Sequence, residues 1–177
     1  MSQLGRAIPA GAVTAMPPIG RPVRADPMAA VLLVLAGGVG IWQLFTPWLR
    51  AGPTAAGGID PAPGGWTVYR ALRLLPAPGT ELRWATLAVL GCAVAGGALV
   101  VLGLAMFAPI NHRPLGLAAL LISLLSSAGA LWVIVHARMV FDLGVFGLFG
   151  QAAVGFYLFL GSGLLGIVGS WKAVSTG

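Results

Sequence analysis

The side chains best suited to chemistry are few, and three of them lie within seven residues of one another: His136, Arg138 and Asp142. A histidine at such a position can change its charge near neutral pH. The cluster is typical either of a solvated turn or of a site for a quinone or a lipid headgroup. Because no further group completes a catalytic mechanism, an enzyme built on these residues is the least favoured hypothesis. We expect that the protein is not an enzyme.

The two histidines exclude a shared metal ion or haem within one chain. His112 and His136 are 24 residues apart, which is roughly 36 Å along a helix. The sequence also lacks metal-ligand spacings, paired carboxylates and a phosphate-binding glycine loop that follows a strand. We therefore expect no cofactor.

Small residues recur at four-residue spacing inside the apolar stretches. On one face of a helix, such residues let two backbones approach closely in lipid. The serines among them lack a base at their depth, so we expect hydroxyls bonded to backbone carbonyls rather than nucleophiles. The spacing fits packing within the chain's own bundle, and it also fits docking onto another membrane protein. The residues are Ala88, Cys92, Gly96, Ser123, Ser127, Ser162, Gly166 and Ser170.

The composition places these residues in a lipid environment. Of the 177 residues, 58% are hydrophobic and 8% are charged, whereas a soluble domain carries about 25% charged residues. The formal net charge is +6, and the arginines are scattered singly beside apolar stretches. They are better suited to lipid headgroups than to nucleic acid, so we expect no nucleic-acid partner.

Four apolar stretches predict an all-α, integral membrane four-helix bundle. They cover residues 28–49, 84–108, 115–137 and 145–171, and about 20 residues suffice to cross a bilayer. The fourth stretch is longer than that, so its start is expected to lie in the interface or the helix to be tilted. Residues 28–177 form the predicted transmembrane domain. A tail, residues 1–27, precedes it; its prolines and glycines predict irregular structure.

The loop at residues 50–83 contains a candidate surface helix. Between turn signals, residues 66–75 would place Trp66, Tyr69, Leu72 and Leu75 near one helical face with two arginines beside it. This pattern predicts a short helix in the membrane interface. The alternative is a loop segment packed on the bundle or on a partner.

Aromatic and charged residues near the ends of the stretches are the candidate partner or lipid contacts. Tryptophan and arginine are the residues that helices place at headgroup level. The candidates are Arg21, Arg24, Trp48, Arg50, Trp66, Tyr69, Arg70, Arg73, His136, Arg138 and Asp142.

The middle of each stretch lacks Asp, Glu, Lys and Arg, which disfavours a proton pump or an ion-coupled transporter. We expect a non-catalytic accessory or assembly subunit of a respiratory, photosynthetic or envelope-assembly complex. Its partners would be other integral membrane subunits and membrane lipids. The alternative is a small oligomeric transporter, channel or lipid-binding protein with a cavity lined by Gln43, Ser123, Ser127 or Ser162.

The cellular location follows from composition and span number. The preference for arginine over lysine, with many alanines, glycines and prolines, is typical of a GC-rich bacterial genome, so we expect the bacterial cytoplasmic membrane. An even number of spans puts both termini on one side. Basic residues number five on each side and do not decide the orientation. Moving an arginine-bearing tail across the membrane is the harder step, which favours cytoplasmic termini.

Overall fold

The computed structural model of the chain describes residues 26–50, 63–74, 79–108 and 112–176. These residues form seven α-helices and two isolated β-bridges, so the described chain is all-α, as predicted. The helices are α1 (Pro27–Trp42), α2 (Gly65–Leu74), α3 (Thr80–Ala105), α4 (His112–Val135), α5 (Ala137–Phe141), α6 (Val145–Gln151) and α7 (Val154–Thr176).

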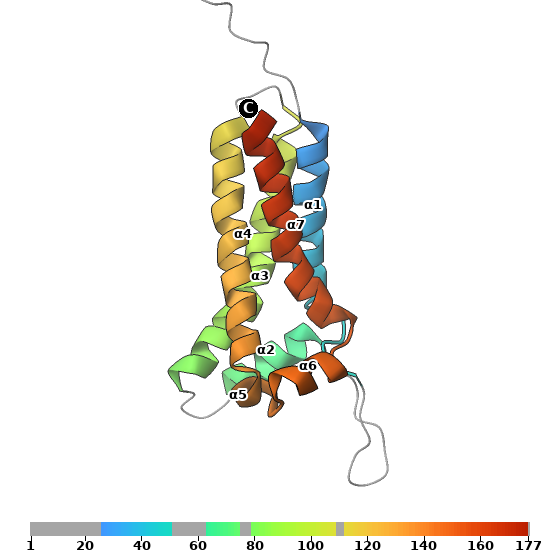
Figure 1. Cartoon of the computed structure of the whole chain (residues 1–177), viewed down its shortest axis with the longest axis vertical. Coiled ribbons are helices and arrows are strands. Elements are labelled where there is room, and N and C mark those ends of the chain that lie inside the picture. The colour runs from blue at the N-terminus through green and yellow to red at the C-terminus, as the bar shows by residue number, and fades with distance from the viewer. Residues whose placement is uncertain (1–25, 51–62, 75–78, 109–111, 177) are drawn as a thin grey trace, which may run out of the picture.

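Four of the helices run side by side as a bundle (Figure 1). α1 packs against α3 and α7, and α4 packs against the same two helices, which closes a ring of four. The three short helices α2, α5 and α6 lie at one end of this ring, which we name the platform end (Figure 1). The start of α1 and the C-terminal end of α7 both lie at the opposite end.

Three helices are long and apolar enough to cross a membrane. They are α3, α4 and residues Val154–Ser175 of α7, with 26, 24 and 22 residues. α1 is also apolar, but its 16 residues rise only about 24 Å, less than the ~30 Å of a hydrocarbon core. The chain is therefore a helical, multi-pass membrane protein.

α1 begins where the sequence provides a cap. A carboxylate oxygen of Asp26 accepts a hydrogen bond from the backbone N–H of Ala29 at 3.1 Å. Pro27 occupies the first helical position, where the missing N–H would have had no partner within the helix. The chain thus enters the bundle at a defined residue.

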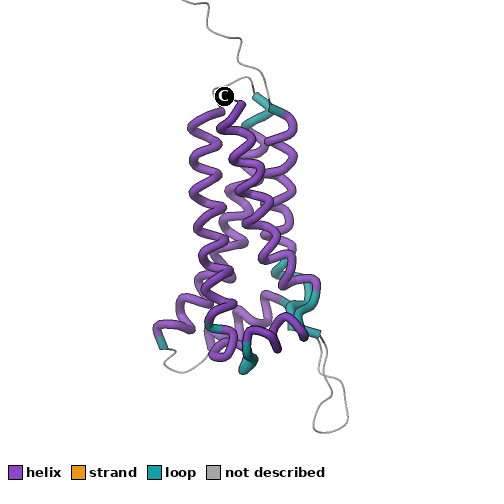
Figure 2. The backbone as a smooth tube through the Cα atoms, in the orientation of Figure 1, coloured by secondary structure: helices purple, strands orange, loops and turns teal. Residues whose placement is uncertain are grey.

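Two of the predicted spans are wrong at the platform end. The stretch 145–171 is not one helix, because α6 ends at Gln151 and α7 begins at Val154. The stretch 28–49 is helical only to Trp42. The segment after α1 bonds to the backbone between α6 and α7: the N–H groups of Ala153 and Gly155 donate to the carbonyls of Trp48 and Pro47, each at 2.8 Å. Figure 2 shows this junction as non-helical backbone.

The remaining boundaries differ from the prediction by a few residues. α3 begins at Thr80 instead of residue 84, and α4 covers His112–Val135 where 115–137 was predicted. The helix predicted at 66–75 is α2, which starts at Gly65. Almost all of the predicted tail and much of the loop 50–83 lie outside the described residues.

Candidate functional site

The seam between α1 and α3 is closed by contact between the two backbones. A Cβ placed on Gly96 would lie 2.6 Å from the carbonyl oxygen of Gly37, and one on Gly103 would lie 2.9 Å from that of Ala30. Neither position has room for a side chain. Close backbone approach of this kind is how helices gain packing energy in lipid, and this seam therefore holds the fold together.

A buried aromatic and amide pair fills the bundle at the platform end. The indole N–H of Trp48 donates to the backbone carbonyl of Gln43 at 3.0 Å and to its side-chain oxygen at 2.9 Å. The amide nitrogen of Gln43 donates in turn to the carbonyl of Val89 on α3 at 3.3 Å. The ring centroids of Trp48 and Phe159 lie 4.7 Å apart. These contacts join the end of α1 to both α3 and α7.

The expected headgroup or partner contact through Trp48 is wrong, because its side chain is completely buried. The chain leaves the helix after Trp42 and folds back, so Trp48 points into the bundle. The side chains of Trp42 and Arg50, by contrast, are exposed. Arg21 and Arg24 lie outside the described residues.

The small residues at four-residue spacing lie on contacts between the chain's own helices. Gly166 of α7 faces Ser123 of α4, Gly163 faces Ser127, and Gly96 lies on the closed seam of α1. The Cys92 thiol lies 3.2 Å from the Ser162 hydroxyl. Ala88 packs against Gly129. Ser170 is buried, and its hydroxyl donates to the carbonyl of Gly166 within α7 at 2.6 Å.

The polar residues expected around a cavity are instead packed. Gln43, Ser123 and Ser162 are buried, and Ser123 and Ser162 donate to the carbonyls of Ala119 and Phe159 at 2.8 and 3.0 Å. Ser127 differs, because its buried hydroxyl has no hydrogen-bond partner among the described residues. These contacts give no support to a conducting cavity lined by the four residues.

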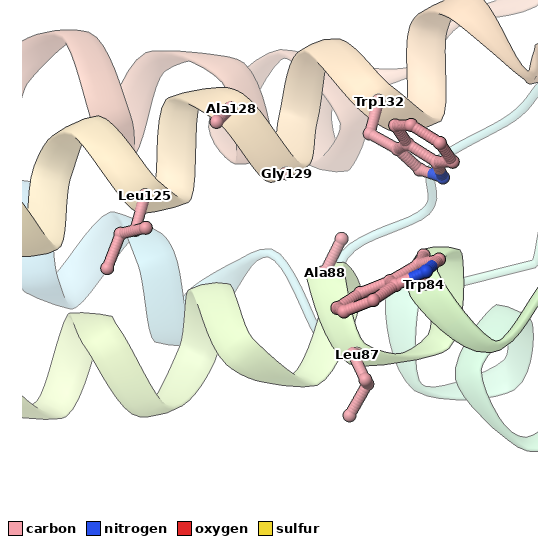
Figure 3. Close-up of a pocket in the computed structure, with 7 residues that line it drawn as sticks. All are labelled: Trp84, Leu87, Ala88, Leu125, Ala128, Gly129 and Trp132. Carbon is pink, nitrogen blue, oxygen red and sulfur yellow. The ribbon is translucent and has the colours of Figure 1, made fainter. Parts of the chain in front are cut away.

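The seam between α3 and α4 is open on its outer side. Figure 3 shows Trp84 and Trp132 at one end of this opening, one on each helix. A hollow of about 330 Å³ begins there and is continuous with a second of about 390 Å³ through shared lining residues. We name the two together the α3–α4 groove. It is lined by Trp84, Leu87, Ala88, Gly91, Cys92, Val94, Ala95, Ala98, Ile122, Leu125, Ser126, Ala128, Gly129 and Trp132.

The α3–α4 groove has a small-residue floor and large walls. At the floor, Ala88 and Gly129 bring the two helices together: a Cβ on Gly129 would lie 3.2 Å from that of Ala88. The walls include Leu87 and Leu125, whose side chains are 58% and 73% exposed. A Cβ on Gly91 would meet no described atom within 4 Å. The groove is thus an apolar surface that the described side chains leave uncovered.

The platform helix α2 carries most of the remaining predicted contacts. Its Val68 and Leu72 are buried against the bundle, whereas Arg70 and Arg73 are exposed. The rings of Trp66 and Tyr69 stack at 5.2 Å. α2 is therefore amphipathic, but its buried face differs from the predicted one: Val68 and Leu72 are buried, whereas Trp66 is exposed.

The cluster His136, Arg138 and Asp142 forms the turn around α5 and does not assemble as a site. His136 bonds through Nδ1 to the carbonyl of Trp132 at 3.0 Å and stacks on that indole at 4.0 Å. Arg138 and Asp142 are exposed, and no hydrogen bond or ion pair joins these three described side chains. Asp142 ends α5 in a left-handed conformation, with φ of 56°.

The other histidine is structural. His112 is buried at the opposite end of α4, where Nε2 lies 2.9 Å from the carbonyl oxygen of Met106. Among the described residues, His, Cys, Asp and Glu do not form a group of three that could hold a metal ion.

The groove itself was missed by the sequence prediction. Trp84 lies near the start of α3 and Trp132 near the end of α4, and a tryptophan at such a position is a recognisable interface signal. The two tryptophans lie together because of the way α3 and α4 are rotated about their axes. This rotation cannot be predicted from the sequence of either helix alone.

Comparison with known protein families, with curated proteins and with solved structures finds no match for this chain.

Proposed function

We propose that the chain crosses the bacterial cytoplasmic membrane four times and serves there as a non-catalytic accessory or assembly subunit of a larger membrane complex. The observation that carries this proposal is the α3–α4 groove, an apolar surface in a membrane-crossing pair of helices that the described side chains leave uncovered. The proposed occupant is a transmembrane helix of a partner subunit.

The fourth crossing is α1. It lies alongside α3 and α7, and the backbone contacts at Gly37 and Gly96 hold it there. Beyond its last helical residue the chain stays buried in the bundle at Gln43 and Leu44. With four crossings, the start of α1 and the end of α7 lie on one side, as Figure 1 shows for these two helix ends. The cytoplasm is the favoured side, because the arginine-bearing tail is then not translocated.

The shape of the groove fits a helix. Its lining on α3 extends from Trp84 to Ala98, a rise of about 21 Å or roughly four helical turns. Small residues along the floor allow another backbone to come close, and helices in contact lie 8–10 Å apart. The leucines of the walls would pack between side chains of the partner. Gly91 in particular is available to an incoming helix, since no described atom occupies the space beside it.

The runner-up function is lipid binding, since an acyl chain also fits an apolar groove. One purification distinguishes the two. The chain is extracted from native membranes in a lipid-preserving polymer as wild type, as Gly91→Leu and as Gly38→Leu, and co-eluting proteins are quantified by mass spectrometry. Gly38 is the control, because a Cβ there also meets nothing within 4 Å but lies on α1.

The expected result is a stoichiometric integral membrane partner with the wild type and with Gly38→Leu, and a yield at least roughly tenfold lower with Gly91→Leu, because leucine fills the floor. Equal partner yield with all three proteins would contradict docking in the groove. A small particle that contains only this chain and lipid would favour the lipid-binding function.

A further inference from the structure

The described residues at the platform end carry an excess of positive charge. They include five arginines, with two carboxylates, Glu81 and Asp142. The arginines are Arg50, Arg70, Arg73, Arg83 and Arg138. Among the described residues, subtracting the two carboxylates from the five guanidinium groups leaves three positive charges, which is the sign that attracts anionic lipid headgroups.

Two of these arginines share a hollow on α2. The hollow has a volume of about 450 Å³ and is lined by Trp66, Tyr69, Arg70, Arg73 and Leu74. Arg70 and Arg73 are three residues apart, a spacing that places two side chains next to each other on a helix. A guanidinium nitrogen of Arg73 also lies 3.5 Å from the Tyr69 hydroxyl oxygen. Two guanidinium groups and a hydroxyl therefore surround one hollow.

The hollow also has an apolar side that is open to the exterior. Leu74 is 80% exposed and Trp66 is 46% exposed. Both are apolar side chains of the kind that pack against acyl chains at the membrane boundary. α2 lies across the end of the bundle in Figure 1, and its buried face holds it there through Val68 and Leu72. In a bilayer crossed by α3, α4 and α7, this position is at the headgroup level.

The geometry points to a binding site on α2 for one anionic glycerophospholipid. The phosphodiester group lies between the guanidinium groups of Arg70 and Arg73, which can each donate two parallel hydrogen bonds to phosphate oxygens. The acyl chains follow Trp66 and Leu74 into the membrane. A helix that combines cationic and apolar groups in this way suits an anionic lipid better than a zwitterionic one. This site is independent of whether a partner helix occupies the α3–α4 groove.

Native mass spectrometry of the full-length chain in detergent tests the site. The probe is an equimolar mixture of phosphatidylglycerol and phosphatidylcholine with identical acyl chains. The test variant is Arg70→Gln with Arg73→Gln. The matched control is Arg83→Gln with Arg138→Gln, which removes the same charge from the same end at exposed residues outside the hollow. Circular dichroism verifies that both double variants keep their helices.

We expect the wild type to retain phosphatidylglycerol preferentially and the Arg70/Arg73 variant to lose roughly tenfold of that preference. The control should stay within about twofold of the wild type, since it keeps both guanidinium groups of the hollow. An equal loss in the two double variants, or a wild type without preference, would overturn the assignment. Displacement of the lipid by inorganic phosphate would also overturn it, because the site would then bind free anions rather than a lipid.

Discussion

The two sides of α3 differ in what lies beside their small residues. Toward α1, Gly96 touches backbone, and a Cβ there would meet the Gly37 carbonyl oxygen at 2.6 Å. Toward the outer side of the α4 seam, Gly91 has no described neighbour within 4 Å of such a Cβ. The same residue type thus closes one seam and leaves the other open. Composition alone therefore does not distinguish a glycine packed against a neighbouring helix from a glycine left uncovered at the surface.

We expect the largest effect on stability at Trp48, which is buried at the platform end beside the end of α1. Trp48→Ala should lower the free energy of unfolding by about 3–5 kcal/mol, because it leaves a large cavity and removes the indole donor from Gln43. Trp84→Ala, at the open groove, should cost less than about 1 kcal/mol, since its side chain is largely exposed. Thermal unfolding of the detergent-solubilised chain measures both changes in stability. Equal losses of stability in Trp48→Ala and Trp84→Ala would contradict the difference between the closed and the open side of α3.

Adjacent glycines on α3 provide the next test. Gly96→Ala should destabilise the chain by about 1–3 kcal/mol, because the added methyl group forces α1 and α3 apart. Gly97→Ala should be neutral or slightly stabilising, since a Cβ there meets no described atom within 4 Å and alanine favours the helix. The unfolding midpoints of the two variants give the comparison. An unchanged unfolding midpoint for Gly96→Ala would contradict close backbone contact between α1 and α3.

The smallest effect is expected at two serines of α4 that face glycines of α7. Ser123→Ala should cost about 0.5–1 kcal/mol, because the Ser123 hydroxyl donates to the carbonyl of Ala119 at 2.8 Å. Ser127→Ala should be neutral or stabilising by up to about 1 kcal/mol, because it removes a buried hydroxyl that no described residue bonds. Chemical unfolding resolves the sign of each change, and a loss at Ser127 as large as that at Ser123 would contradict the packing described.

The sequence predicted the elements better than their ends. Long uncharged stretches indicate membrane helices because each must bury its own backbone polar groups, and α3 and α4 lie close to the predicted ranges. The break before α7 was missed, since no proline or charge marks it in residues 145–171. It forms because Ala153 and Gly155 bond to the backbone around Trp48. Such contacts join residues about 100 positions apart and are set by tertiary structure.

The same limit applies to the candidate sites. The amphipathic pattern of α2 is local, so Arg70 and Arg73 were identified from the sequence as candidate contacts. The α3–α4 groove depends on which faces of two helices meet, and its wall residues Leu87 and Leu125 look like any other lipid-facing leucine in the sequence. Trp48 was placed at the membrane surface because a tryptophan near an arginine is typical of that position, yet the chain folds it inward.

The most direct test of the proposed function is site-specific photo-crosslinking in native membranes. A photoreactive phenylalanine analogue replaces Leu125 in the groove wall or, as a control, Leu164 of α7, which is 63% exposed. A partner helix in the groove predicts one discrete protein adduct from position 125. Peptide mapping should place it in a transmembrane segment of the partner, and adding Gly91→Leu should abolish it. Adducts with lipid alone at position 125, or the same protein adduct from position 164, would contradict the account.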